Sequence, residues 1–208
     1  MGNKPFHYYN IRAYIQHHYD WKCVEGLEAD DLMAIEQTKC NDEYYGLRTI
    51  ICTRDKDCYA VEGLLYGWEI GRQPARGPML VTSLGEIQLN QKRNKIIGSG
   101  GLFFYSQCLT GDTVDTIPGL PGCGPVKAFE ALSQAKCLED AYNLVLGMYT
   151  KVYGDRALEC LTEQARLLYM TRVLIHSKIL LWNPPNSEYE DWYDLDTRKI
   201  ERAIRVQP

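Results

Sequence analysis

Apolar residues recur at two different spacings along the chain and predict a mixed first half. A helical spacing predicts helices at 10–18 and from Leu27 onward. The second of these helices has acidic residues in its first turn, where the positive end of the helix dipole stabilises negative charge. The runs 21–24 and 48–53 (RTIICT) predict strands, and the second has the β-branched, continuously apolar composition of a strand buried in a parallel sheet. Strand, helix and strand in this order predict an α/β sheet.

The second half of the chain has a different pattern. After a loop at 72–78, the segment 79–89 predicts a hairpin or two short strands, and the glycine-rich run 98–101 predicts a flexible joint. Beyond it the apolar spacing predicts four helices, at 102–109, 126–132, 138–153 and 156–175.

The chain is therefore expected to consist of an α/β core at 1–97, a helical half at 98–182 and a tail at 183–208. The tail is acidic and aromatic, with a small helix predicted at 197–205. The rest of the tail is interpreted as a disordered end or, alternatively, as a segment that binds a partner.

Composition limits the class of protein. Of the 208 residues, 45% are hydrophobic and 24% are charged, which excludes a disordered or collagen-like chain. The net charge of −4 means that nucleic acid would have to be bound by local basic patches rather than by bulk charge. Lys92, Arg93 and Lys95 either form such a patch or belong to a solvated loop.

Cysteine usage and hydropathy bear on the compartment. The eight cysteines form no CxxC pair and several lie in apolar runs, so reduced thiols and a cytosolic environment are expected. The first nine residues lack the apolar core of a signal peptide. No uncharged apolar stretch approaches 18 residues, so no membrane partner is expected.

Acidic residues gather in three places, at 28–31 (EADD), at 55–57 (DKD), and at Asp112 and Asp115. The second group follows the predicted strand RTIICT, at the end of a strand where open α/β sheets carry their sites. Converging carboxylates would select Mg²⁺ or Mn²⁺, and two such ions support phosphodiester hydrolysis. Three unrelated solvated turns are the alternative. A DxDxT phosphatase is excluded because Tyr59 stands where the threonine is required.

A glycine- and proline-rich turn follows the third acidic group, at 111–125 (GDTVDTIPGLPGCGP). Such a turn, leading into a helix, lets backbone N–H groups approach a phosphate closely. It is typical of a helix-hairpin-helix type of duplex contact, which reads the backbone rather than the base sequence.

Together, EADD at 28–31, TRDKD at 53–57 and GDTVDTIPGLPGCGP at 111–125 resemble the 5′-nuclease superfamily, in the family's order. That superfamily includes flap endonucleases, the 5′-nuclease domain of bacterial DNA polymerase I and phage 5′→3′ exonucleases. The segments 165–168 and 178–184 look most like the phage enzymes, and the resemblance covers about 1–184. It implies a PIN-like (Rossmann-like) parallel-sheet core followed by a helical half with a helix-hairpin-helix type motif.

The resemblance also implies roles for the acidic residues around two Mg²⁺ or Mn²⁺ ions. Glu28 and Asp30 would hold the first ion, and Asp55 would lie between the two. Asp57, Asp112 and Asp115 would hold the second ion, with Asp31 supporting the cluster.

The turn is implied to bind unbroken duplex, with K⁺ on its backbone carbonyls in many relatives. Its implied contacts are Gly119, Gly122, Gly124 and Lys127. The lysine departs from the family pattern, because Val126 directly follows Gly-Pro and Lys127 comes one residue later. On a helix this is a rotation of about 100°.

A second departure lies at the start of the chain. Family members begin with an apolar strand and two aspartates of the first metal site, followed by a basic arch, of which only Lys4 and Arg12 resemble remnants. The core is therefore expected to be incomplete at its N-terminus. The chain is interpreted as a fragment, as a split gene product completed by a separate N-terminal segment, or as an incompletely competent relative.

The expected function is a divalent-metal-dependent 5′→3′ exonuclease or 5′ flap endonuclease. It would act on DNA 5′ ends, flaps and duplexes in replication or repair, in a bacterial or phage-infected cytosol. Removal of RNA primers from RNA–DNA duplexes stays open. The alternative is a non-catalytic DNA-binding or accessory protein that retains the duplex contact without turning over.

Overall fold

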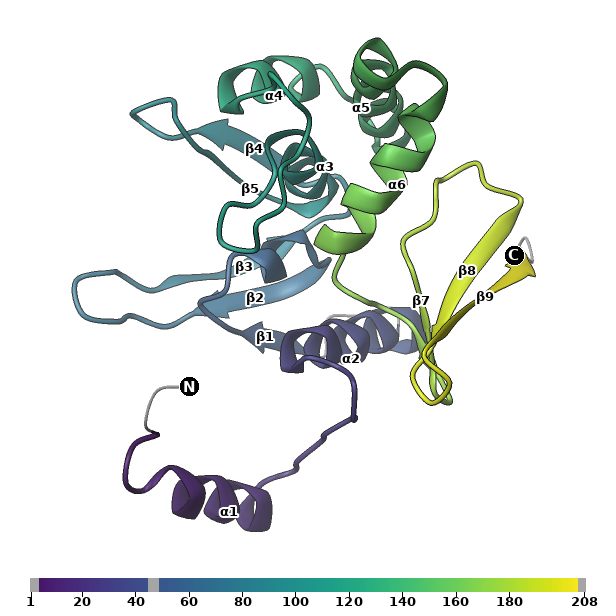
Figure 1. Ribbon diagram of the computed structural model, residues 1–208. Helices are drawn as coiled ribbons and strands as arrows, with labels where there is room; N and C mark the ends of the chain where they lie inside the picture. Colours follow the sequence, from purple (N-terminus) through teal and green to yellow (C-terminus); the bar gives the residue numbers. More distant parts are fainter. Residues whose placement is uncertain (1–3, 45–48, 206–208) are drawn as a thin grey trace.

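The structure is a computed structural model that describes residues 4–44 and 49–205 (Figure 1). Its N-terminal half contains a small mixed sheet. Its order is β1 (Ile50–Cys52), β2 (Gly63–Gly67) and β3 (Arg76–Val81), with β2 parallel to β1 and antiparallel to β3. The helix α2 (Ala29–Tyr44) lies against β1 and β2. The chain is thus a mixed α/β protein, as predicted, with its parallel pairing confined in this sheet to β1 and β2.

The strand predicted at 48–53 is confirmed for Ile50–Cys52, while Arg48 lies outside the described residues. The expectation that it is buried on both faces is wrong. Ile51 shares a buried face with Leu65 and Val81, whereas Ile50, on the opposite face, is 43% exposed. The physical reason is that β1 is the outermost strand of its sheet, and its second face is open to solvent in the described chain.

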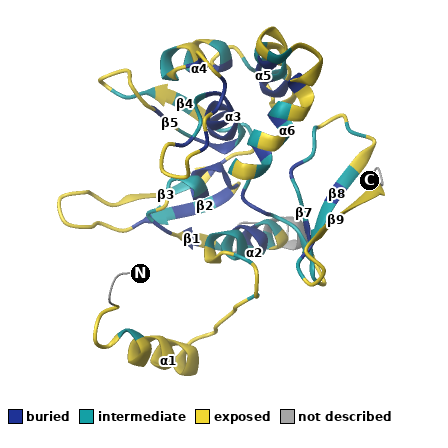
Figure 2. Cartoon of the chain, in the orientation of Figure 1, coloured by how far each residue is buried: buried dark blue, intermediate teal, exposed yellow. Residues whose placement is uncertain are grey.

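The first helix, α1 (Tyr8–His18), lies apart from the rest of the chain and buries none of its residues (Figures 1 and 2). The predicted helix at 10–18 is therefore confirmed, although its apolar side chains have no core to enter. The strand predicted at 21–24 is wrong, because this segment pairs with no strand among residues 4–44 and 49–205 and forms part of the link between α1 and α2.

Beyond β3 the chain forms a separate hairpin of β4 (Glu86–Leu89) and β5 (Ile96–Ser99). Of the two structures predicted for 79–89, two short strands is the correct one, since β3 pairs with β2 and β4 with β5. The flexible joint predicted at 98–101 is wrong. Gly100 is buried at a positive φ, and an added Cβ would lie 2.7 Å from the Cα of Gly85, so the two backbones are tightly packed there.

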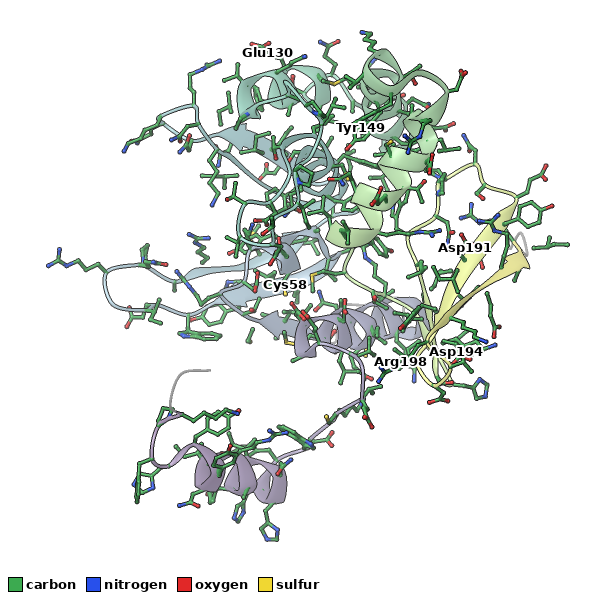
Figure 3. All side chains as sticks on the ribbon, viewed as in Figure 1. Cys58, Glu130, Tyr149, Asp191, Asp194 and Arg198 are labelled. Atoms are coloured by element: carbon green, nitrogen blue, oxygen red, sulfur yellow. The ribbon has the colours of Figure 1, made fainter. Side chains whose placement is uncertain are left out.

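The helical half is built around α3 (Gly100–Thr110), which contacts α4 (Pro125–Leu132), α5 (Leu138–Tyr153) and α6 (Ala157–Leu168). Leu109, at the end of α3, is fully buried, and the hydroxyl of buried Tyr149 on α5 donates to the Cys108 carbonyl at 2.7 Å (Figure 3). The helices predicted at 102–109, 126–132 and 138–153 are confirmed. None of the described helices combines the length and apolar character needed to cross a bilayer.

Two short single-turn helices complete the helical elements, η1 (Asp57–Ala60) after β1 and η2 (Gly154–Arg156) between α5 and α6. The helix predicted at 156–175 is only partly correct, because α6 ends at Leu168. The chain then becomes extended and enters β6 (Leu174–Ile175), followed by β7 (Lys178–Leu180).

The tail forms a β-hairpin of β8 (Tyr189–Asp194) and β9 (Lys199–Ile204) within a sheet of order β6-β7-β8-β9. The small helix at 197–205 and the disordered end are therefore both wrong. Aromatic and β-branched residues favour strands here. Asp194 also fixes the turn by accepting from the N–H groups of Asp196 and Thr197, each at 2.9 Å, near Arg198 (Figure 3).

A buried carboxylate joins this hairpin to the helical half. Asp191, which is 5% exposed, accepts two hydrogen bonds from Arg202 at 2.6 and 2.8 Å and one from Arg166 of α6 at 2.8 Å. These bonds, led by those from Arg202, lower the pKa of Asp191 to about 2. The ionised form is therefore the one that stabilises the fold.

We predict that Asp191→Asn lowers the free energy of unfolding at pH 7 by about 1–2 kcal/mol, because it removes the charge that pairs with Arg166 and Arg202. The loss is no larger because solvent screens the exposed part of Arg202. The native pKa lies below the ordinary value, so the stabilisation is complete above pH about 4 and is lost as the pH falls toward 2. Urea unfolding between pH 7 and pH 3 measures this. Asp196→Asn, in the exposed turn, is the control, and equal stability losses in the two variants would contradict the assignment.

Candidate metal centre

Six of the predicted acidic residues line a single cavity of about 530 Å³. They come from three segments that are distant in the sequence: the start of α2, the loop after β1, and the loop after α3. The residues are Glu28, Asp30, Asp31, Asp55, Asp57 and Asp115. The fold thus brings together the three acidic groups. Asp112 does not line the cavity itself but lies next to Asp57 and Asp115, which do.

Three carboxylates form a tight cluster at this cavity. Asp57, Asp112 and Asp115 each offer one oxygen, and these oxygens lie within 4.8 Å of one another. Asp112 is buried at 4% exposure, Asp57 is half-buried and Asp115 is exposed. Carboxylate oxygens are the ligands that Mg²⁺ and Mn²⁺ prefer, so this cluster can bind a divalent cation.

Lys56 partly neutralises the cluster. Its ammonium donates to Asp112 Oδ2 and lies 4.0 Å from Asp57 Oδ1. Burial opposes ionisation of Asp112, but the Lys56 bond and the Val114 N–H outweigh it, so the pKa of Asp112 lies below its ordinary value. Burial also opposes the charge on Lys56, and the hydrogen bond to Asp112 nevertheless raises the lysine pKa. A divalent ion entering the cluster would compete with this ammonium.

Asp57 is oriented by its neighbours. Gln107 of α3 donates to Asp57 Oδ1 at 2.7 Å, and the Asp57 N–H donates to Asp55 Oδ1 at 3.1 Å. Burial, together with the charges of Asp55 and Asp112, raises the pKa of Asp57 above its ordinary value. A bound cation would remove this penalty by favouring the ionised carboxylate.

The acidic residues at the start of α2 face the same cavity. Asp31 accepts from the Thr171 N–H at 2.7 Å, which ties α2 to the extended segment after α6. Burial and the nearby charges of Asp30 and Glu28 raise the pKa of Asp31. Within the described chain, Glu28, Asp30 and Asp55 share the cavity but do not belong to the tight cluster.

Sequence reasoning missed two residues of the site, Lys56 and Gln107. Lys56 stands within the DKD motif, but its pairing with Asp112 joins positions 56 residues apart. Gln107 is a polar residue inside the apolar segment LFFYSQCL of α3. A buried amide requires a hydrogen-bonding partner, and this is the one signal that could have identified it.

The turn after the cluster is held by close backbone packing. Gly111 and Gly119 both have positive φ, and a Cβ on Gly119 would overlap the backbone of Gly111. The Gly119 N–H donates to Gln164 Oε1 of α6 at 3.1 Å. Glycine at 111 and 119 is therefore explained by packing.

The outer part of the turn is open. Gly122 has positive φ, Gly124 precedes α4 without a side-chain cap, and a Cβ at either would meet no atom within 4 Å. The exposed Lys127 ammonium donates to the Gly122 carbonyl at 3.4 Å. The three glycines and the lysine thus lie in one turn and the first turn of α4.

Comparison with known proteins gives one distant relationship. The chain is 26% identical to the flap endonuclease Xni of Shewanella halifaxensis (strain HAW-EB4) over 159 residues. The match covers 76% of this chain and 58% of that protein, so the chain spans less than two thirds of the relative's length. No protein-family model matches the chain, and no solved structure matches it. The similarity suggests membership of the 5′-nuclease family and goes no further.

We predict that Asp115→Asn weakens Mn²⁺ binding by at least about tenfold, a loss that even outer partners of a metal site commonly cause. Asp115 is exposed, so the substitution should leave the fold intact. Isothermal titration with MnCl₂ measures the affinity, and Asp155→Asn, an exposed carboxylate outside this cavity, is the matched control. Equal affinities in the two variants would show that the cluster does not bind the ion.

We further predict that Lys56→Gln strengthens Mn²⁺ binding, because the ammonium that pairs with Asp112 no longer competes with the ion. Glutamine retains an N–H donor for Asp112 while removing the charge. The same titration detects the change, with Lys22→Gln, an exposed lysine paired with Glu36, as control. Weaker binding in Lys56→Gln would instead mean that the lysine assists the ion.

Proposed function

We propose that this chain contributes a divalent-metal-dependent 5′-nuclease centre that hydrolyses phosphodiester bonds at DNA 5′ ends and flaps. The observation that carries the proposal is the Asp57, Asp112 and Asp115 cluster, which adjoins a cavity also lined by Glu28 and Asp30. The distant similarity to a flap endonuclease supports the same reaction class. In this proposal the α/β part corresponds to a PIN-like core and the helical half to the duplex-binding part.

The acidic residues would divide between two ions. Glu28 and Asp30 would hold the first ion, Asp57, Asp112 and Asp115 the second, and Asp55 would lie between them. When bound, Mg²⁺ or Mn²⁺ supplies activation of water and stabilisation of the leaving oxygen. This chemistry requires no histidine or serine nucleophile from the chain.

The surrounding residues would keep the carboxylates in position. Gln107 fixes one oxygen of Asp57, which leaves the other free for a ligand. Asp31 is engaged by the Thr171 N–H, so we propose that it supports the cluster rather than binding an ion directly. Lys56 would neutralise the negative charge of Asp112 while no metal ion is bound, and a bound ion would displace its ammonium.

The open turn would bind the backbone of unbroken duplex. Its glycines permit close approach of a phosphate, and the free N–H groups at the start of α4 favour an anion. Gly122, Gly124 and Lys127 are the proposed direct contacts, and Gly119, whose N–H is held by Gln164, would shape the turn that presents them. K⁺ on the carbonyls of the turn would serve the same duplex contact. The exposure of Gly122 and Gly124 supports this proposal, since duplex can reach them.

A separate N-terminal segment is the proposed partner that completes the site. Within the described residues, β1 pairs on one side only, and Ile50 on its outer face is 43% exposed. A further strand and covering helix would bury this surface and could deliver additional carboxylates to the first ion. RNA–DNA primers are an alternative substrate that the same geometry would accept.

We predict that Asp57→Asn lowers Mn²⁺-dependent release of label from a 5′-labelled flap by about 100-fold or more, because the stabilisation by a bound ion is worth several kcal/mol. Binding of duplex should change little, since the proposed duplex contacts lie in the turn. Cleavage is measured by gel and binding by fluorescence anisotropy. Asp155→Asn is again the matched control.

The assay is run with the chain alone and with a separate polypeptide that carries the N-terminal strand and aspartates of the 5′-nuclease pattern. Release of label only in the second case supports a site completed in trans. Cleavage that survives Asp57→Asn rejects the proposed centre. Duplex binding without cleavage in both cases rejects the nuclease proposal and favours the non-catalytic accessory role.

A further inference from the structure

A second groove, of about 710 Å³, lies beside the acidic cluster. It is bordered by β3 on one side and by the β4–β5 hairpin on the other, and η1 and α3 contribute to it. The two hairpins, β2–β3 and β4–β5, project from the same side of the molecule, away from the C-terminal sheet (Figure 1). None of the roles proposed above uses this groove.

The charge of the groove is opposite to that of the chain. Three cationic side chains line it, those of Lys56, Arg76 and Lys95, against one carboxylate, that of Glu86. The whole chain carries a net charge of −4. The charged groups of Arg76 and Lys95 are exposed and pair with no described residue. A polyanion would therefore meet unneutralised cations here.

The walls between the cations are apolar. Met79 of β3 and Ile87 of β4 are partly exposed, and Ile97 of β5 is 47% exposed. An anion alone would gain nothing from such walls, whereas a nucleotide with an accessible base would bury apolar surface against them. Bases inside a duplex are stacked on their neighbours and do not present these faces. The combination favours a single strand.

The groove adjoins the acidic cluster through Lys56. Lys56 lines the groove and donates to Asp112 of the cluster. At the other end, Gln88 and Ile97 also line an adjoining cavity at the hairpin tip that includes Lys92. Cations therefore follow the surface from the hairpin tip to the carboxylates.

We propose that this groove binds the sugar–phosphate backbone of single-stranded DNA and leads the strand to the acidic cluster. Arg76 and Lys95 would contact phosphates, and Met79, Ile87 and Ile97 would contact bases. The proposal rests on the proposed nuclease function for its purpose, but the binding itself is independent of catalysis. The basic residues Lys92 and Lys95 then belong to a nucleic-acid surface rather than to an unspecialised solvated loop.

We predict that the double variant Arg76→Gln/Lys95→Gln binds a fluorescein-labelled single-stranded oligonucleotide about tenfold more weakly at 0.1 M salt, with the slope of log affinity against log salt reduced by roughly 1. Fluorescence anisotropy in EDTA measures both quantities without cleavage. The control is Arg198→Gln/Lys199→Gln, which removes the same two charges from the turn of the β8–β9 hairpin. A blunt hairpin duplex should lose less than about twofold, since its bases cannot reach the apolar walls.

Each outcome decides the proposal. Equal affinity and slope in the groove variant and the control would overturn it, whatever the result for Asp57→Asn. An equal loss for single strand and duplex would also overturn it, because the groove would then be a general polyanion contact. A selective loss for single strand supports it, even if no form of the chain cleaves DNA, in which case only the nuclease proposal fails.

Discussion

Repulsion among carboxylates is the constraint on which the organisation of this molecule depends. One oxygen each of Asp57, Asp112 and Asp115 lie within 4.8 Å of one another, and four further acidic residues line the same cavity. Charges this close destabilise a fold unless cations or hydrogen bonds offset them. The chain supplies a partial compensation in Lys56, in Gln107 and in the backbone N–H groups of Val114 and Thr171. Burial and, after it, the neighbouring carboxylates raise the pKa values of Asp31 and Asp57, so these hydrogen bonds do not remove the whole cost of the charges.

The core provides the force that holds these charges together. Helix α3 connects the two parts of the molecule, because it carries Gln107 toward the cluster and packs its apolar residues against α4, α5 and α6. Leu109, Leu132 and Val145 are fully buried in one continuous cluster with Ile51 and Leu65 of the sheet. Burying such side chains contributes roughly 1.5–3 kcal/mol each. The free energy gained by hydrophobic burial thus offsets the electrostatic repulsion among the carboxylates of the cavity.

Local patterns in the sequence predicted the elements that local physics determines. The spacing of apolar residues located α3, α4 and α5, and the β-branched run located β1. The burial of Ile50 was predicted wrongly, because it depends on which elements cover the strand. The flexibility of 98–101 was predicted wrongly, because it depends on how two backbones pack. The tail was also predicted wrongly, since its hairpin is joined to the helical half by Asp191, which pairs with arginines on α6 and β9. Strand pairing and ion pairs between distant segments are not encoded in local spacing.

The candidate site was predictable to a similar extent. Three acidic motifs identified the carboxylates that share the cavity, and their roles toward metal ions stay predictions. Lys56 and Gln107 were missed because each acts on a residue about 50 positions away in the sequence. A motif records which residues recur, whereas the charge balance of a site depends on which side chains the fold delivers to it.

The separation of charge across the surface has a consequence for any polyanionic substrate. A phosphodiester approaching the carboxylates directly would be repelled, and a bound divalent cation would reverse that only at short range, because salt screens charges beyond about 8–10 Å. In the proposed binding mode, Arg76 and Lys95 act on neighbouring phosphates rather than on the phosphodiester at the cluster. Lys56 belongs to both surfaces, since it lines the groove and pairs with Asp112. Displacement of its ammonium by an ion would free a positive charge next to the groove at the moment the cluster becomes able to accept a phosphate. Binding of the ion and of the strand would then favour each other through a single side chain.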